Sequence, residues 1–482
     1  MPCGGECAIR DNLVRLMTAP DRRPGVINCL ADWIERHGTA ALVAVGLVLA
    51  LTYGVALEAL RKPDGRIVTG DAVHYYVYLR SWVFDQDIHF RNEYIRLYRL
   101  QGGEEGTEWI YQETPTGHVR NMMAIGTPVA WAPAYLVGVM TLCLTALAGV
   151  TGWPDGFERI LQASAGFSGI AAATVGTVLT YRMCRRLFGA RLALVSTLAI
   201  WLGSSALYYS LVSPTYSHAT SMMVVSGLFL YWAGSRQHQT LRRYLILGAL
   251  IGLAALVRWQ DAVFVVLPFI DAIAAGRKRL AGFDWAGATR HLGAAGVGAV
   301  LVFSVQMIVW LVLYGQPLVI PQSEGFMQWH APHLGSVLFS DWHGLFTWTP
   351  IVALAVAGLI PLHRRDPWLA AGLLAAFLAS WWANGSVADW WAGEAFGARR
   401  FVSGFPIFVV GFAALFDWMK LTPRSTLVMT AVLVSLNLLL LLQYQLFMHG
   451  WRDLAPYPRG WYGLLIARFV VPIDLIERLM GE

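Results

Sequence analysis

The sequence predicts an all-α, multi-pass membrane protein. Of its 482 residues, 56% are hydrophobic and only 14% are charged, whereas charged residues make up about a quarter of an ordinary soluble domain. Mean hydropathy is +0.51. Apolar runs recur at about the 20-residue length with which a helix crosses the hydrocarbon layer, and they lack the alternation that is typical of barrel strands.

The positive charge of the chain indicates its topology rather than a nucleic-acid surface. The net charge is +6, but Lys and Arg form short clusters between apolar runs, which is the pattern of cytoplasmic loops in membrane proteins. We therefore expect membrane lipids, and no nucleic acid, among the partners of this chain.

The first 39 residues are expected to form a cytoplasmic segment, because they carry several arginines and basic segments stay on the cytoplasmic side. A single membrane domain is predicted over 40–446. It begins with a span at about 40–60 that is retained rather than cleaved as a signal peptide. Residues 447–482 are assigned to the outer face, where 461–480 has the pattern of an amphipathic surface helix broken at Pro472.

About eleven transmembrane helices are predicted in all. After the first, they fall near 160–182, 192–212, 218–234, 243–257, 260–275, 292–313, 346–362, 367–384, 400–417 and 425–446. This assignment leaves long outer loops at 61–158, 314–345 and 385–400.

The apolar segment from Met122 to Val150 allows two topologies, because it is long enough to span but is interrupted by Pro128 and Pro133. Five basic clusters decide between them: 182–191, 236–243, 277–279, 363–365 and 420–424. If the segment spans, the first two clusters fall outside. If it is re-entrant or lies on the surface, all five fall inside, as the positive-inside rule requires. We expect the second topology.

The stretch from Gly70 to Ser81 follows the first span and is predicted to be an amphipathic helix on the membrane surface. Asp71 stands at its head, and residues three, four and seven apart share a helix face. One such face carries His74, Tyr78, Ser81 and Asp85, and the other is apolar. The helix would therefore present an acid and a histidine to water.

Two further groups of charged residues lie on the same predicted side. Arg258 and Asp261 interrupt an apolar stretch, and ionisable residues within a membrane are costly and commonly functional; alternatively, the two neutralise each other. Arg399 and Arg400 follow a loop rich in Trp and Gly. Two such guanidinium groups could clamp a phosphate bidentately, or could anchor the helix end in lipid headgroups.

Four short motifs together resemble the GT-C membrane glycosyltransferases, the class of protein O-mannosyltransferases and lipid A aminoarabinose transferases. They are Gly-Asp-x-x-His-Tyr at 70–75, Arg-Arg-Leu-Phe-Gly at 185–189, Ala-Leu-Val-Arg at 255–258 and Gly-Ala-Arg-Arg-Phe at 397–401. The resemblance runs from about residue 40 to 420. It implies a GT-C-like fold with amphipathic juxtamembrane helices.

The resemblance implies an enzyme that moves a sugar from a polyprenyl-phosphate donor to a glycan, lipid or protein acceptor. Transfer would occur with inversion, at the outer face of a bacterial plasma membrane. Asp71 would be the general base and His74 a second catalytic residue. The donor phosphate would be bound by Arg399, Arg400 and Arg258. Further substrate contacts are expected from Tyr75, Asp85, Glu93, His218, His330 and Glu394.

No metal or other cofactor is expected, because arginine could neutralise the phosphate and the histidines of the loop from Gln322 to His343 fit no standard metal spacing. Two features depart from the family pattern. Asp71 is followed by Ala72 where an acidic pair is common, and the outer loop after the third span carries Tyr216 and His218 in place of an acid.

Two other function classes are compatible with the composition. In a transporter or flippase, Arg258, Asp261 and Asp71 would be coupling charges, and inverted repeats would be expected; the sequence shows no such repeat. The other class is a non-catalytic assembly subunit.

Overall fold

The computed structural model describes residues 26–59, 65–98, 108–276, 284–393 and 395–481. In this part of the chain the elements are helices, accompanied by two isolated β-bridges. The prediction of an all-α multi-pass membrane fold is confirmed. The basic cluster at 277–279 and the predicted substrate contact Glu394 lie outside the described residues.

Seven helical segments in the described part of the chain are long and apolar enough to cross a membrane. They are α2 (Val26–Ala59), α6 (Gly126–Leu147), α7 (Arg159–Phe188), η2 (Trp259–Val265) with α12 (Val266–Gly276), α13 (Trp285–Tyr314), η3 (Arg399–Gly404) with α19 (Phe405–Met419), and α20 (Pro423–Met448). An eighth is the pair α8 (Ala190–Leu202) and α9 (Ser205–Leu211), which is bent by 73°.

The other predicted spans are also helical, but shorter, broken or less apolar. They are α10 (Ser217–Ser235), α11 (Leu241–Val257), α16 (Pro350–Ala357) with α17 (Leu359–Arg365), and α18 (Pro367–Gly385). The number eleven therefore stays a prediction.

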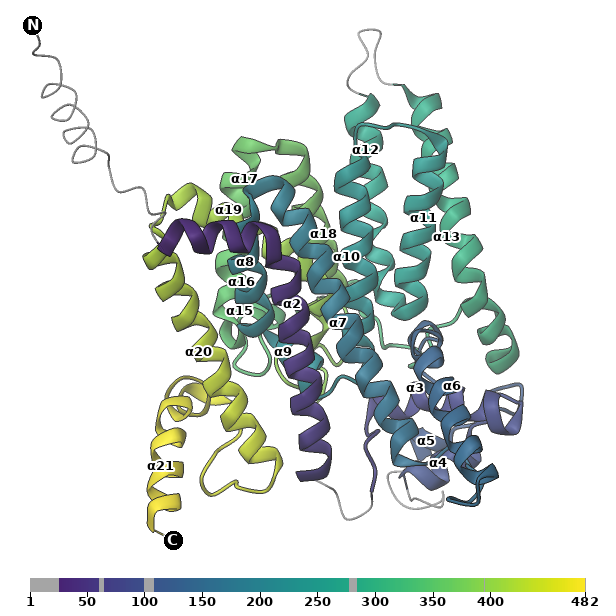
Figure 1. Ribbon diagram of the computed structural model, residues 1–482. Helices are drawn as coiled ribbons and strands as arrows, with labels where there is room; N and C mark the ends of the chain where they lie inside the picture. The colour runs from purple at the N-terminus through teal and green to yellow at the C-terminus, as the bar shows by residue number, and fades with distance from the viewer. Residues whose placement is uncertain (1–25, 60–64, 99–107, 277–283, 394, 482) are drawn as a thin grey trace, which may run out of the picture.

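Close backbone contact between α11 and α13 forms one side of the bundle (Figure 1). Gly248 and Gly252 on α11 face the carbonyl oxygens of Ala295 and Ala299, and Gly298 on α13 faces that of Leu245. A Cβ atom at any of the three would collide with the backbone of the other helix. Glycine is therefore required here by the approach of the two helices.

The basic clusters that the structure describes converge at one end of the bundle, here called the basic end. Arg365 donates to the Leu187 carbonyl and pairs with Asp417 at 2.9 Å. Arg236 pairs with Asp366, which is the N-cap of α18. These contacts join the ends of α7, α10, α17 and α19, as the predicted topology requires.

The opposite end of the bundle holds the described residues between α2 and α7, 65–98 and 108–158. Arg159, the first residue of α7, donates to the Leu57 carbonyl at 2.8 Å and to Glu58 at 3.2 Å near the end of α2. The chain therefore leaves α2 and enters α7 at the same end. Because α6 is the one described helix between them that is long enough to span, α6 does not carry the chain across. This agrees with the second of the two topologies.

The segment after α2 folds into a small helical unit around α3 (Asp71–Arg80), followed by the π-helical turn η1 (Ser81–Asp85), α4 (Arg91–Tyr98) and α5 (Glu108–Tyr111). The prediction that α3 lies on the membrane surface is wrong, because residues 72–79 are buried on every face. The tyrosines explain the error. Tyr75 and Tyr76 pack against Trp131 and Tyr135 of α6, and their hydroxyls are satisfied by Ser217 and Gly156.

The C-terminal segment contains η4 (Tyr462–Ile466) and α21 (Ala467–Gly481), which packs against α20. Contrary to the prediction, α21 is not broken at Pro472, since a proline removes one backbone hydrogen bond and can kink a helix without ending it. Arg468 is buried and donates to the Leu464 carbonyl at 2.7 Å.

Candidate functional site

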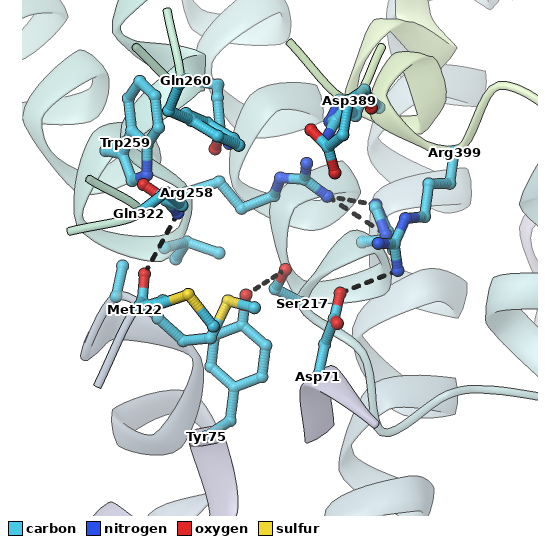
Figure 2. Close-up of a pocket in the computed structure, with 16 residues that line it drawn as sticks. Asp71, Tyr75, Met122, Ser217, Arg258, Trp259, Gln260, Gln322, Asp389 and Arg399 are labelled. Atoms are coloured by element: carbon cyan, nitrogen blue, oxygen red, sulfur yellow. Dashed lines mark hydrogen bonds and ion pairs between the residues drawn. The ribbon is translucent and has the colours of Figure 1, made fainter. Parts of the chain in front are cut away.

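A cavity of about 330 Å³ lies at the end of the bundle that holds α3, opposite the basic end (Figure 2). Its walls come from four regions that are distant in sequence: the head of α3, residues 122–124, the adjoining ends of α10 and α11, and the outer loops around residues 322 and 389–400. Three arginines and two aspartates line it: Arg258, Arg399, Arg400, Asp71 and Asp389.

Asp71 points into the cavity from the N-terminus of α3. Its Oδ2 lies 2.7 Å from Arg399 Nη1, and its side chain is 34% exposed. Gly70, with φ +59°, sets the start of the helix, and a Cβ there would approach the Tyr216 hydroxyl. The guanidinium of Arg399 also lies over the Tyr216 ring, 5.6 Å from its centroid. Arg399 therefore holds the carboxylate in a fixed place.

Arg400 is held by Asp389 through two hydrogen bonds. It donates from Nη1 to the Asp389 carbonyl and from Nη2 to Asp389 Oδ1, each at 2.8 Å. The loop between the two residues turns back on itself at Ala392 and Gly393, which both have positive φ. Asp389 thus places a second carboxylate at the cavity.

Arg258 has a different kind of partner. It lies at the break between α11 and η2, in extended backbone conformation, and is 9% exposed. Its Nη1 donates to the His218 ring, with close contact to Nδ1 and 3.3 Å to Nε2. Within the described residues Arg258 and Asp261 form no ion pair, and Asp261 accepts a hydrogen bond from Ser221 at 2.5 Å. The two charges therefore interact electrostatically without a direct contact.

His74 does not line the cavity. Its Nδ1 lies 2.8 Å from the Tyr94 hydroxyl and its Nε2 3.0 Å from the Tyr98 hydroxyl. Burial lowers the pKa of His74 to about 4, so the imidazole is neutral at physiological pH. The structure brings Tyr75, His218, Arg258, Arg399 and Arg400 together with Asp71, but not His74.

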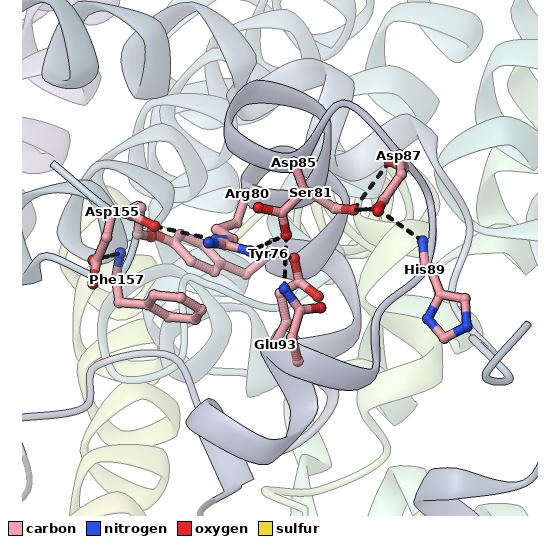
Figure 3. Close-up of polar contacts among 11 residues, drawn as sticks. Tyr76, Arg80, Ser81, Asp85, Asp87, His89, Glu93, Asp155 and Phe157 are labelled. Carbon is pink, nitrogen blue, oxygen red and sulfur yellow. Dashed lines mark hydrogen bonds and ion pairs between the residues drawn. The ribbon is translucent and has the colours of Figure 1, made fainter.

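Asp85 and Glu93 belong to a separate ionic cluster beneath the C-terminal end of α3 (Figure 3). Arg80 pairs closely with Asp85, lies 2.9 Å from Glu93 and donates to the Asp155 carbonyl. Burial raises the pKa of Glu93 to about 7, although Arg80 acts in the opposite direction. Neither acid lines the cavity, and His330 is exposed on the outer loop.

The histidines of the outer loop do not converge on one another. His343 is buried, with Nδ1 2.6 Å from the Trp391 carbonyl and Nε2 2.6 Å from the Tyr457 hydroxyl. Burial lowers its pKa to about 4. Across the described ranges, no group of three or more His, Cys, Asp or Glu side chains is placed to hold a metal ion.

Several cavity residues were not predicted individually as site residues: Asp389, Ser217, Trp259, Gln260 and Gln322. Trp259 and Gln260 directly follow Arg258, Ser217 precedes His218, and Asp389 and Gln322 lie in the predicted outer loops. Their places next to predicted residues or in these loops were the signal that could have identified them.

Comparison with known proteins gives a family match over part of the chain and a similar fold over most of it. The family model for dolichyl-phosphate-mannose-protein mannosyltransferases matches residues 157–310. No curated protein matches the chain in sequence.

Among solved structures, apo ArnT from Cupriavidus metallidurans is similar at 14% identity, with 90% of this chain and 74% of that chain covered and a TM-score of 0.50. ArnT bound to undecaprenyl phosphate has 14% identity, coverage of 90% and 75%, and a TM-score of 0.49. The oligosaccharyltransferase AglB from Archaeoglobus fulgidus has 13% identity, coverage of 92% and 56%, and a TM-score of 0.45.

At such low identity, the match to apo ArnT shows a shared fold. The family match covers about a third of the chain and agrees with the resemblance to the GT-C membrane glycosyltransferases that the sequence motifs predicted.

Proposed function

We propose that this protein transfers a sugar from a polyprenyl-phosphate donor to an acceptor hydroxyl in the cavity at the head of α3. The observation that carries the proposal is the meeting of one helix-terminal carboxylate, Asp71, with three guanidinium groups around a single cavity. The family matched by residues 157–310 is described by its dolichyl-phosphate-linked donor, which supports this donor class.

The arginines supply what the leaving phosphate needs. When the bond between the anomeric carbon and the phosphate oxygen breaks, negative charge develops on the departing polyprenyl phosphate. Fixed guanidinium groups stabilise that charge without reorganisation, and such preorganised electrostatics is usually the largest catalytic term. Arg258 and Arg400 are proposed to bind the phosphate.

Asp71 is proposed as the general base. The acceptor oxygen attacks the anomeric carbon from the face opposite the phosphate, its proton passes to Asp71, and the configuration inverts. Arg399 orients the carboxylate through the 2.7 Å contact. A positioned base contributes about 10²- to 10⁴-fold to the rate.

The cavity is proposed to face the outer side of a bacterial plasma membrane. It lies opposite the basic end, where Arg182, Arg185 and Arg186 are exposed, and basic loops stay in the cytoplasm.

Donor consumption by the purified protein tests the proposal. The protein in lipid nanodiscs is incubated with a panel of polyprenyl-phosphate monosaccharides and a membrane extract as the source of acceptor, and release of free polyprenyl phosphate is followed by mass spectrometry. Wild-type protein should consume at least one donor. If no donor is consumed but one is moved across vesicle membranes, the protein is a flippase and the proposal is wrong.

A further inference from the structure

The three arginines of the cavity differ in the charge of their partners. Arg399 is paired with the carboxylate of Asp71, and Arg400 with that of Asp389. Arg258 donates instead to the imidazole of His218. Among the residues that the structure describes, Arg258 has no ion pair with a carboxylate, although it is 9% exposed.

His218 is built into the cavity wall in a fixed orientation. It belongs to the first turn of α10 and is 3% exposed. Its ring lies 4.4 Å from that of Tyr209 between centroids, and is stacked at 13° on the ring of Tyr216. The ring therefore has little freedom to turn away from Arg258.

The chemistry of the contact requires a neutral imidazole. A guanidinium group has only donors, so the facing ring nitrogen of His218 must accept. Other charged groups near the ring reinforce this state, because Arg399 and Arg400 from η3 also lie close to it. Asp261 from η2 accepts a hydrogen bond from Ser221 and interacts with Arg258 electrostatically, without a direct ion pair. The contact therefore orients Arg258 without offsetting its charge.

We infer that His218 is a positioning residue that keeps Arg258 available for the donor phosphate. A carboxylate in its place would hold the guanidinium equally well but would compete with the phosphate for it. A buried cation whose direct hydrogen-bond partner is neutral attracts an anion more strongly than one paired with a carboxylate. The inference rests on the proposed function and adds which arginine binds the phosphate first, and why.

The inference predicts how the charge and hydrogen bonding of residue 218 affect donor binding. His218→Gln supplies a neutral acceptor and should bind undecaprenyl phosphate within about fivefold of wild type. His218→Leu removes the acceptor and His218→Glu adds a competing charge. Each should weaken binding by about 10- to 100-fold, the loss expected for one charged hydrogen bond.

Affinity is measured by titrating undecaprenyl phosphate into purified protein in nanodiscs and following the tryptophan fluorescence, to which Trp259 in the cavity wall contributes. The matched control is His291→Glu, since His291 is stacked on Tyr244 and lies outside the cavity. It adds the same charge and should leave affinity unchanged. In turnover assays the His218 variants should raise KM for the donor more than they lower kcat.

Wild-type affinity in His218→Glu would overturn the inference. If that variant does not fold, the pair His218→Leu and His218→Gln decides: weaker binding by the leucine variant supports the inference, and equal binding overturns it. If wild-type protein does not bind undecaprenyl phosphate at all, the proposed function fails and the inference fails with it.

Discussion

The two ends of the helical bundle use the same residue types for different purposes. At the basic end, Arg236, Arg243 and Arg365 each pair with one aspartate, at 2.5, 2.5 and 2.9 Å. At the cavity, three arginines face two aspartates. The cavity differs in one respect: Arg258 donates to the His218 ring and, among the described residues, has no ion pair with a carboxylate.

The energetic consequences also differ between the ends. The Arg365–Asp417 pair is half exposed on both sides, and such surface pairs contribute about 0–1 kcal/mol. Arg399 is 16% and Arg400 10% exposed, so their charges are poorly screened by water. These two arginines should therefore act more strongly on an anion than the half-exposed Arg365 does.

The largest effect we expect is in cysteine labelling. Because the two ends should lie on opposite sides of the membrane, a cysteine at one end should react in intact cells and a cysteine at the other should not. Cys184 is buried and unsuitable as a probe, so single cysteines are introduced after the five native ones are replaced. Ala331→Cys, in an exposed stretch of the outer loop, should react with an impermeant maleimide in intact cells. Arg186→Cys, at the basic end, should react only after permeabilisation. Labelling of Arg186→Cys in intact cells would reverse the assignment of the two ends.

Asp71→Asn should lower turnover by at least about 10²-fold, because the amide keeps the shape of the side chain but cannot accept the acceptor proton. Donor binding and thermal stability should stay close to wild type. Asp417→Asn is the matched control, since it removes an arginine-paired carboxylate at the other end and should not change turnover. Near wild-type transfer by Asp71→Asn would mean that another group is the base.

Arg400→Lys should weaken donor binding by about 1.5–3 kcal/mol, since lysine keeps the charge but loses the planar fork that donates to the carbonyl and Oδ1 of Asp389 and is proposed to bind the phosphate. Arg243→Lys is the comparison at the basic end. Arg243 donates to Asp271 and Ser235, so that variant should lower the thermal midpoint without changing the affinity of the folded protein. Equal donor affinity in Arg400→Lys and wild type would mean that Arg400 has a purely structural role.

Much of the cavity could be predicted from the sequence because charge is rare in this chain. Asp71, Arg258, Arg399 and Arg400 stand out against 56% hydrophobic composition, and each lines the cavity. Asp389 was not predicted as a site residue, because its contact with Arg400 depends on a turn with positive φ at Ala392 and Gly393. Such a turn is not specified by the residue types alone.

The error at α3 has a different origin. Helical spacing predicts which residues share a face, but not whether the face is covered by another segment. His74 and Tyr78 were expected in water, yet both are buried by the chain that folds back over α3. The prediction treated Tyr78 as a polar residue that faces water. A tyrosine ring is buried as readily as an apolar side chain when its hydroxyl forms a hydrogen bond.

Arg80 differs from the arginines at both ends, because it has two carboxylate partners, Asp85 and Glu93. Where one guanidinium group meets two carboxyl groups, the more buried one, here Glu93, should be the one that keeps its proton. Burial accordingly raises the pKa of Glu93 to about 7, against about 4.3 in an unfolded chain. Between these values the folded protein binds a proton that the unfolded chain has lost, so the free energy of unfolding should fall as pH rises.

The smallest effect we expect is the pH dependence of stability in Glu93→Gln. From pH 5 to pH 7 the wild-type contribution of Glu93 should fall by about 2 kcal/mol and then level off. Glutamine does not titrate but can still accept a hydrogen bond from Arg80. The thermal midpoint of Glu93→Gln should therefore rise relative to that of wild type as pH increases. His74 and His343 act in the opposite direction but are present in both proteins, so the difference between the two thermal midpoints isolates Glu93. If the thermal midpoints of the two proteins changed in parallel from pH 5 to pH 8, Glu93 would have an ordinary pKa in the folded protein. Arg80 would then pair with two ionised carboxylates, whereas Arg399 and Arg400 at the cavity each pair with one.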